Sequence, residues 1–213
     1  MITLEETLSN LKSPIKLIGE VCDNKKKTIL IVGVVHGEEP QGKFLIEQYL
    51  KTANLSQFKN NLIFIPCLNP DGLKKGERQN ANGIDLNRSF PTKNWKLSER
   101  NQYYGGEKPN SEPETKFMID IFEKYSPDII LTIHAPYKVV NYDGPAEDIA
   151  QRISSIIGYE TSSDIGYPTI GSMGNYFGVE RNIPIITLEL DEEIPVESFL
   201  NPMFKIFELL GNY

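Results

Sequence analysis

The sequence predicts an α/β fold in which parallel strands alternate with helices. Three apolar runs rich in β-branched residues, at 31–35, 61–67 and 128–133, are typical of buried strands. Amphipathic helical patterns lie between them, at 40–50 and 111–125. Strands that are separated by helices in this way pair in parallel through crossover connections, so the three observations together predict an α/β architecture.

The bulk composition sets the domain organisation and excludes several classes of protein. The chain has 213 residues, of which 39% are hydrophobic, so we expect one buried core and a single domain over residues 1–213. The net charge of −7 argues against a nucleic-acid surface, because phosphate binding needs a basic stripe. No apolar run approaches the length of a membrane span, and the acidic N-terminus lacks the layout of a signal peptide. We therefore expect a cytoplasmic protein that binds neither nucleic acid nor membrane.

The N-terminal part is expected to form a helix, an edge strand and a hairpin. Residues 3–12 carry leucines at helical spacing, and residues 15–21 alternate like an edge strand. Residues 23–27, with three lysines, are interpreted as the solvated loop that closes the first hairpin. Cys22 and Cys67 lack metal-binding spacing and are interpreted as reduced, buried thiols. The elements expected next are a buried strand at 31–35, a helix from residue 40, a buried strand at 61–67 and turns at 68–72.

The C-terminal part begins with a segment that lacks any regular period. Residues 76–91, GERQNANGIDLNRSFP, form a long irregular segment, which inside a compact domain is usually functional. Residues 111–114, SEPE, read as a capping box at the start of a helix. The elements expected after the strand at 128–133 are a loop with one short strand at 135–145, a helix at 149–157, a glycine-rich turn at 166–174 that leads into a helix, a buried strand at 183–190 and a terminal helix at 196–210.

The two histidines of the chain each follow an apolar strand-like run. His36 follows the first run and is three residues before Glu39, and His134 follows the run at 128–133. Ligands bind at the carboxyl ends of the strands in an open α/β sheet, and imidazole and carboxylate groups are ligands of zinc. Each histidine alone could equally be a hydrogen-bonded core residue, but the pair favours a zinc site. Glu189 stands near the end of the apolar run at 183–190, where a carboxylate needs a reason for its burial.

Taken together, these motifs resemble the zinc carboxypeptidase family in order and spacing. The resemblance rests on His36-x-x-Glu39, the Asn87-Arg88 pair in NANGIDLNRSFP, His134 and Glu189, and it extends from residue 31 to residue 190. The segments LNPDGL, RQNANGIDLNRSFP, SEPET, IHAPYKVVNYDGP and GYPTIGSMG look most similar to the murein peptide amidase A branch, the γ-D-glutamyl-meso-diaminopimelate amidases. The resemblance implies a mixed, mostly parallel, twisted sheet of about eight strands between helices.

The resemblance also implies a metal site and its nearest support. One Zn²⁺ per chain would be held by His36, Glu39 and His134, with water in the open fourth position. Glu38 is the rival carboxylate, but only the third position after the histidine fits the family. Asp85 matches the family position that accepts a hydrogen bond from His36 and thereby fixes its tautomer.

The catalytic and substrate-binding residues follow from the same resemblance. Glu189 matches the general base, and Arg78 matches the arginine that polarises the scissile carbonyl and stabilises the oxyanion. Asn87 and Arg88 match the pair that grips the free carboxylate of the substrate. A tyrosine that covers the substrate is expected at Tyr167, with Tyr142 and Tyr176 as alternatives.

The implied function is that of a zinc-dependent hydrolase. Its substrate would be a small peptide whose amide is cleaved before a carboxylate-bearing residue, namely the γ-D-glutamyl-meso-diaminopimelate bond of the murein tripeptide in peptidoglycan recycling. A general metallocarboxypeptidase and a desuccinylase-like amidohydrolase are alternatives within the enzyme class. A catalytically silent, metal-dependent protein that binds wall peptides is the alternative from another class, and Glu189 argues against it, because binding alone needs no base. The sequence does not indicate an oligomeric state.

Overall fold

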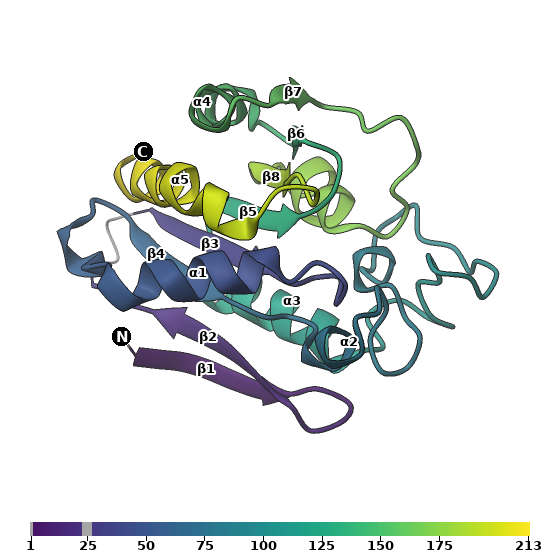
Figure 1. The fold of residues 1–213 in the computed structure, drawn as a ribbon. Coiled ribbons are helices and arrows are strands. Elements are labelled where there is room, and N and C mark those ends of the chain that lie inside the picture. The colour runs from purple at the N-terminus through teal and green to yellow at the C-terminus, as the bar shows by residue number, and fades with distance from the viewer. Residues whose placement is uncertain (1, 23–26) are drawn as a thin grey trace.

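The computed structural model, which describes residues 2–22 and 27–213, contains one eight-stranded sheet between helices (Figure 1). The strand order is β1-β2-β4-β3-β5-β8-β6-β7. β3 pairs in parallel with β4 and β5, β5 with β8, and β6 with β7, whereas the other neighbours are antiparallel. The predicted α/β class with a mixed sheet is therefore confirmed. The strands are β1 (Ile2–Leu8), β2 (Pro14–Gly19), β3 (Thr28–Gly33), β4 (Asn61–Ile65), β5 (Ile129–His134), β6 (Val139–Asp143), β7 (Glu160–Ser162) and β8 (Ile185–Glu189).

Helices cover both faces of the sheet. α1 (Gln41–Thr52), α4 (Glu147–Ile157) and α5 (Leu200–Asn212) pack on one face, around a core that includes Phe64 and Leu131. α3 (Pro113–Tyr125) and the π-helix η3 (Gly174–Val179) pack on the other, around Leu30 and Ile130. In the central strands, side chains on both faces of the sheet are 0% exposed. This burial explains why the sequences of these strands are continuous apolar runs. The remaining short elements are α2 (Pro70–Lys75), η1 (Leu55–Gln57), η2 (Leu86–Arg88) and η4 (Val196–Phe199).

The N-terminal prediction was wrong in three respects. Residues 3–12 do not form a helix, because Ile2–Leu8 is the strand β1, which pairs with β2 as an antiparallel hairpin. β2 is therefore not an edge strand, since it lies between β1 and β4. Its second antiparallel partner, besides β1, is β4 rather than β3, so the expected hairpin with the next strand does not form. Of the loop predicted to close that hairpin, residues 23–26 lie outside the described residues.

Several smaller predictions also need correction. The capping box is wrong, because Glu112 is the N-cap of α3 and makes no side-chain capping bond, while Pro113 occupies the first turn. Of the turns expected at 68–72, residues 70–72 instead form the start of the short helix α2, whose N-cap side chain, Asn69 Oδ1, accepts from Gly72 N. Cys22 is exposed and Cys67 half-buried, so neither thiol is fully buried as expected. The short strand β7 was not predicted.

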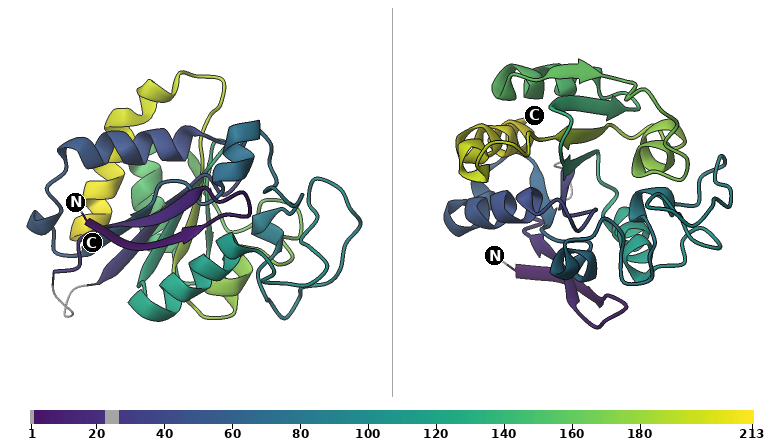
Figure 2. Two further views of the ribbon diagram at one scale, coloured as in Figure 1. Left: turned by 90° about the horizontal axis from the view of Figure 1, so that it is seen from below. Right: turned by 45° about the vertical axis from the view of Figure 1, so that its right-hand side comes forward.

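The carboxyl ends of the parallel strands meet at one edge of the sheet. β3 ends three residues before His36, and β5 and β8 end at His134 and Glu189, which face each other in the ladder. The irregular chain between α2 and α3 lies beyond one end of the sheet (Figure 2). Within the described ranges, no helix is long and apolar enough to span a membrane.

Candidate metal centre and cleft

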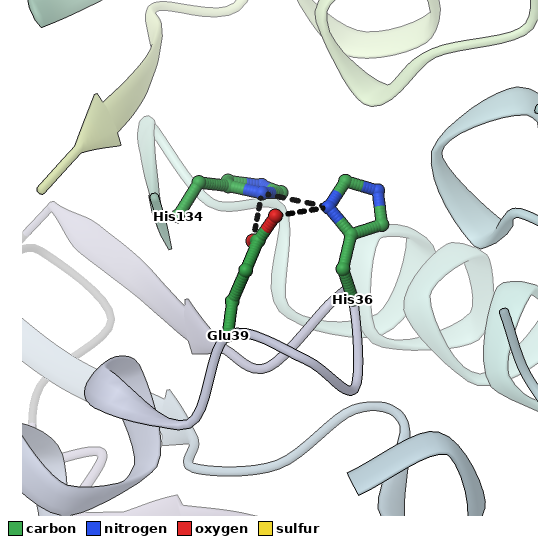
Figure 3. Close-up of side chains that lie close together, drawn as sticks. All are labelled: His36, Glu39 and His134. Carbon is green, nitrogen blue, oxygen red and sulfur yellow. Dashed lines mark hydrogen bonds and ion pairs between the residues drawn. The ribbon is translucent and has the colours of Figure 1, made fainter. Parts of the chain in front are cut away.

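Three buried side chains converge where β3 and β5 end. The carboxylate of Glu39 lies between the rings of His36 and His134, as Figure 3 shows. Glu39 Oε1 is 2.8 Å from His36 Nδ1, and Glu39 Oε2 is 2.8 Å from His134 Nδ1. The three side chains are 3%, 6% and 3% exposed in chain order, so little water reaches the ligand atoms.

The donor set and its spacing fit a zinc ion. The Nδ1 atoms of His36 and His134 are 3.3 Å apart, and a tetrahedral zinc with bonds of about 2.05 Å separates two nitrogen ligands by about 3.3 Å. All potential ligand atoms lie within 4.8 Å of one another. Burial by itself would lower the pKa of His36, but the charges of Glu39 and Asp85 raise that pKa to about 9. The same cluster therefore favours positive charge at its centre, which a divalent cation would supply.

The backbone after β3 is bent so that His36 enters the cluster. Val34 has a φ of +52°, a conformation that is strained for a β-branched residue and costs roughly 1–3 kcal/mol. Two hydrogen bonds hold this bend, from Asn69 N to Val34 O (2.9 Å) and from Leu68 N to Gly33 O (3.1 Å). At Gly37 a Cβ atom would lie 2.0 Å from the carbonyl carbon of Gly72, so only glycine lets the loop pass α2. Packing against α2 thus fixes the direction of the loop.

Asp85 links the metal cluster to the irregular segment. Its carboxylate is 0% exposed, and Asp85 Oδ1 lies 3.2 Å from His36 Nε2 and accepts a hydrogen bond from Asn87 N at 2.9 Å. Asp85 Oδ2 accepts from Arg78 Nε at 3.0 Å. Burial would raise the pKa of Asp85, but His36 and Arg78 hold it well below its ordinary value. An ionised Asp85 keeps a proton on Nε2 of His36 and leaves its Nδ1 free to bind a metal.

Glu189 lies next to the cluster at the end of β8. It is 6% exposed, and its Oε2 atom has no hydrogen-bond partner among the described residues. Burial is the largest influence on its pKa and raises it, against the opposing effect of His134. A buried carboxylate with an unsatisfied oxygen is chemically suited to accept a proton from a bound molecule.

Two arginines and an asparagine of the irregular segment line the same cleft, which has a volume of about 210 Å³. The guanidinium carbons of Arg78 and Arg88 lie 5.2 and 5.8 Å from the centroid of the Tyr103 ring. Asn87 Oδ1 accepts a hydrogen bond from Met173 N at 2.9 Å, so its amide nitrogen is the atom directed to other acceptors. The Arg88 backbone carbonyl accepts from the Trp95 indole at 3.2 Å, which fixes the chain at this point.

Of the three tyrosines considered from the sequence, only Tyr167 lines the cleft. Tyr167 lines the cleft and is 41% exposed, and burial together with the neighbouring Tyr137 raises its pKa to about 12. The alternative Tyr176 is buried against Phe90, and Tyr142 packs on the core, so neither lines the cleft.

Some lining residues were not identified from the sequence. Tyr103, Tyr137 and Asp143 also line the cleft. Tyr137 and Asp143 lie within the segment IHAPYKVVNYDGP, but the sequence assigned no role to them, and no motif included Tyr103. The rival carboxylate Glu38 is exposed and does not join the histidines; it approaches Arg78, with Glu38 Oε1 3.8 Å from Arg78 Nη1. Apart from the alternatives Tyr142 and Tyr176, the residues assigned to the site from the sequence thus all belong to the metal cluster, contact it or line the cleft.

A carboxylate behind the cleft holds the irregular segment. Glu112 Oε2 accepts hydrogen bonds from the side-chain amides of Asn10 (2.9 Å), Asn80 (2.8 Å) and Asn82 (2.8 Å). Asn10 belongs to the turn between β1 and β2, whereas the other two asparagines belong to the irregular segment. Glu112 therefore ties the N-terminal hairpin to the chain that lines the cleft.

Glu114 lies beside this network in an unusual environment. It is 0% exposed, and its Oε1 has no hydrogen-bond partner within the described parts of the chain. Burial raises the pKa of its carboxyl to about 7, and the hydrogen bond that Asn80 donates opposes this only in part. Neutral Glu114 is therefore the favoured form in the fold up to about that pH.

Comparisons with known proteins agree with this geometry. A family model described as zinc carboxypeptidase matches residues 15–150. Murein peptide amidase A of Escherichia coli (strain K12) is 28% identical over 193 residues, which cover 85% of this chain and 78% of that protein. The amidase of the same name from Vibrio campbellii is 28% identical over 218 residues, which cover 94% and 85%. The crystal structure of the murein-tripeptide amidase from Escherichia coli O157 superposes with a TM-score of 0.84 at 26% identity, over 97% of this chain and 90% of that chain.

Proposed function

The chain belongs to the zinc carboxypeptidase family and is a hydrolytic enzyme, and from this premise we propose that it is a murein peptide amidase. Its substrate is the tripeptide L-Ala-γ-D-Glu-meso-diaminopimelate, and the bond cleaved is the amide between D-Glu and diaminopimelate. One Zn²⁺ per chain is the cofactor, and the reaction takes place in the cytoplasm during peptidoglycan recycling.

Two observations support the substrate. The relatives of this name align with most of the chain, and the chain covers more than two thirds of their length. The observation that carries the proposal is that Asn87 and Arg88 line the same cleft as the His36–Glu39–His134 cluster and Glu189. Donors for a carboxylate beside a metal cluster and a base suit a substrate whose leaving residue has a free carboxylate.

The metal would be held by His36, Glu39 and His134. When bound there, Zn²⁺ supplies Lewis-acid activation of the scissile carbonyl and lowers the pKa of a coordinated water. Asp85 orients His36 by accepting from its Nε2–H, so that the lone pair of Nδ1 faces the metal.

Glu189 moves the protons of the hydrolysis. Its buried carboxylate takes a proton from the attacking water as the oxygen–carbon bond forms. It then delivers that proton to the nitrogen of the leaving residue as the carbon–nitrogen bond breaks, so the products are a carboxylic acid and an amine, and transfer of the acid's proton to the amine gives a carboxylate and an ammonium group. Arg78 is held by Asp85 and donates to the carbonyl oxygen, on which negative charge develops.

The remaining residues orient the substrate. The guanidinium of Arg88 and the amide nitrogen of Asn87 bind the free carboxylate of the leaving residue, and the planar fork of arginine suits a bidentate contact. Tyr167 closes over the substrate from the segment between β7 and η3. These contacts place the scissile amide between Glu189 and the metal cluster.

A product assay tests the proposal. We expect the purified enzyme to release diaminopimelate from the tripeptide, and we expect 1,10-phenanthroline to stop the reaction and added Zn²⁺ to restore it. The comparison substrates are N-succinyl-diaminopimelate and C-terminally free L-dipeptides. Faster cleavage of the L-dipeptides would indicate a general metallocarboxypeptidase, and faster cleavage of the succinyl compound a desuccinylase. Tight binding of the tripeptide without any turnover would indicate a binding protein.

A further inference from the structure

Asn69 is a fully buried polar residue between β4 and α2, in the segment LNPDGL. Its Oδ1 atom accepts from Gly72 N at 2.9 Å and so caps α2. Aspartate or serine would serve this cap equally well, but neither carries the NH₂ group of asparagine, which can donate two hydrogen bonds. Because the side chain is 0% exposed, this group needs acceptors within the protein.

The amide nitrogen of Asn69 is directed at backbone carbonyl groups next to the site. Asn69 Nδ2 donates to Arg78 O at 3.3 Å, and Val35 O lies 3.5 Å away, at the limit for a hydrogen bond. The backbone N of Asn69 donates to Val34 O at 2.9 Å. One buried residue therefore contacts both the chain just before His36 and the chain at Arg78.

The backbone carbonyl of Arg78 joins these two stretches of chain. Besides the bond from Asn69 Nδ2, Arg78 O accepts from Gly37 N at 3.3 Å, and Gly37 belongs to the loop of the metal cluster. The packing around the amide is tight, because a Cβ atom at Gly72 would lie 2.5 Å from Asn69 Nδ2 and 2.5 Å from Gln79 O. The Asn69 amide is therefore wedged between the first turn of α2 and the backbone of Arg78.

We propose that Asn69 is a positioning residue for the hydrolysis, whose amide fixes the backbone of Arg78 so that the guanidinium stays beside the carbonyl oxygen of the substrate. The inference rests on the proposed function, in which Arg78 donates to that oxygen. The other end of Arg78 is held by Asp85, whose Oδ2 accepts from Arg78 Nε at 3.0 Å. With its backbone and its guanidinium both anchored, the long arginine side chain loses its rotamer freedom before the substrate binds.

Two substitutions separate the helix cap from the positioning of Arg78. Asn69→Asp keeps an acceptor for Gly72 N but sets a carboxylate oxygen against Arg78 O in place of the donor. A displacement of about 1 Å can cost roughly 100-fold, so we expect kcat/KM for the tripeptide to fall about 10- to 100-fold. The loss should lie mainly in kcat, because Asn87 and Arg88 bind the substrate carboxylate. Asn69→Ser, whose hydroxyl can cap α2 but is too short to reach Arg78 O, should show a smaller loss of the same kind.

A double-mutant cycle tests whether Asn69 acts through Arg78. Arg78→Ala removes the guanidinium, leaves the backbone carbonyl and should by itself lower kcat/KM. In the Arg78→Ala background, Asn69→Asp should change kcat/KM by less than about twofold, because the group that it positions is gone. An equal fold-loss in both backgrounds would overturn the inference. A loss in Asn69→Asp with none in Asn69→Ser would also overturn it, since the introduced charge would then explain the effect. If Asn69→Asp does not fold, Asn69→Ser takes its place in the cycle.

Asn60→Asp is the matched control. Asn60 is 6% exposed, its Nδ2 donates to a backbone carbonyl, Leu210 O, at 2.9 Å, and it precedes β4 at the edge of the sheet opposite to the metal cluster. We expect this variant to lose stability and to keep the kcat/KM of the wild type. A comparable fall in kcat/KM would assign the effect of Asn69→Asp to general destabilisation and overturn the inference.

The choice of substrate separates this inference from the proposed function. If the wild type cleaves L-dipeptides rather than the tripeptide, the proposed substrate is wrong, but the same cycle on the L-dipeptides still tests Asn69, because Arg78 would polarise the scissile carbonyl of either substrate. If the wild type cleaves neither, the proposed function fails and the inference falls with it.

Discussion

Replacement of Asp85 by asparagine is the most informative single change at the metal cluster. The Asp85 carboxylate accepts hydrogen bonds from three groups: His36 Nε2 at 3.2 Å, Arg78 Nε at 3.0 Å and Asn87 N at 2.9 Å. An amide has one acceptor oxygen where the carboxylate has two, so the Asp85→Asn side chain keeps either the contacts of Oδ1 or the contact of Oδ2. The favoured orientation keeps the hydrogen bonds from His36 Nε2 and Asn87 N to the amide oxygen. It places the amide NH₂ group next to Arg78 Nε, so that two hydrogen-bond donors face each other without an acceptor.

The expected losses follow from these contacts. An unsatisfied, largely buried donor costs about 1–3 kcal/mol of stability, and the loss of a carboxylate behind a metal-binding histidine lowers metal affinity or activity about 10- to 100-fold. We therefore expect Asp85→Asn to weaken zinc binding by at least about tenfold and to lower kcat/KM by a larger factor, because Arg78 is also displaced. Competition with a chelator of known affinity measures the first, and the tripeptide assay measures the second.

Asp71→Asn is the matched control for this experiment. Asp71 is likewise 0% exposed, and its carboxylate accepts three hydrogen bonds, from Ser9 Oγ, Ser13 Oγ and Leu11 N in the turn between β1 and β2. We expect it to lose stability without losing zinc affinity. Zinc affinity and turnover of Asp85→Asn within twofold of the wild type would refute the reasoning, and so would an equal loss of zinc affinity in the two variants.

Three further predictions concern the base, the carboxylate-binding arginine and the buried acid behind the cleft. Glu189→Gln should lower kcat by about 10²- to 10⁴-fold while the zinc content, measured by elemental mass spectrometry, stays at the wild-type level; undiminished turnover would remove Glu189 from the mechanism. Arg88→Lys should raise KM for the tripeptide more than it lowers kcat, because a point charge replaces a bidentate fork, and an unchanged KM would contradict that role. Glu114 has a folded-state pKa of about 7, above its ordinary value of 4.5, so the folded protein binds the extra proton between these two pH values. Its contribution to the free energy of unfolding is therefore highest below pH 4.5, declines as the pH rises to about 7, and changes by up to about 3 kcal/mol in total. Glu114→Gln should remove this dependence and gain stability relative to the wild type at pH 8, as denaturant unfolding at pH 5 and pH 8 would show; identical pH dependence in both proteins would contradict it.

The central sheet could be predicted because its strands are buried on both faces. Runs such as 61–67 and 128–133 contain enough consecutive apolar residues to identify a strand without knowledge of its partners. The hairpin of β1 and β2 lacks such a continuous apolar run. β1 is largely exposed, so Leu4 and Leu8 fit a helical spacing as well as a strand, and only pairing with β2 decides between them.

The candidate site likewise contains residues that could be identified from the sequence and residues that could not. His36, Glu39 and His134 could be identified because each stands at or just after the end of a recognisable strand, and the structure brings them together, while their roles as zinc ligands stay predictions. Tyr103 and Asp143 could not be identified in this way. Tyr103 reaches the cleft through an irregular chain, and Asp143 does so through an antiparallel pairing between strands far apart in sequence. Neither arrangement leaves a local pattern in the sequence.

The shared carboxylate behind the cleft bears on how this enzyme can be engineered. Chain termini and exposed loop tips are ordinarily the parts of a domain that best tolerate truncation, insertion or circular permutation. Here Asn10 and Asn80 bind the same oxygen of Glu112, so deletion of the first hairpin would release one anchor of the loop beside the reaction centre.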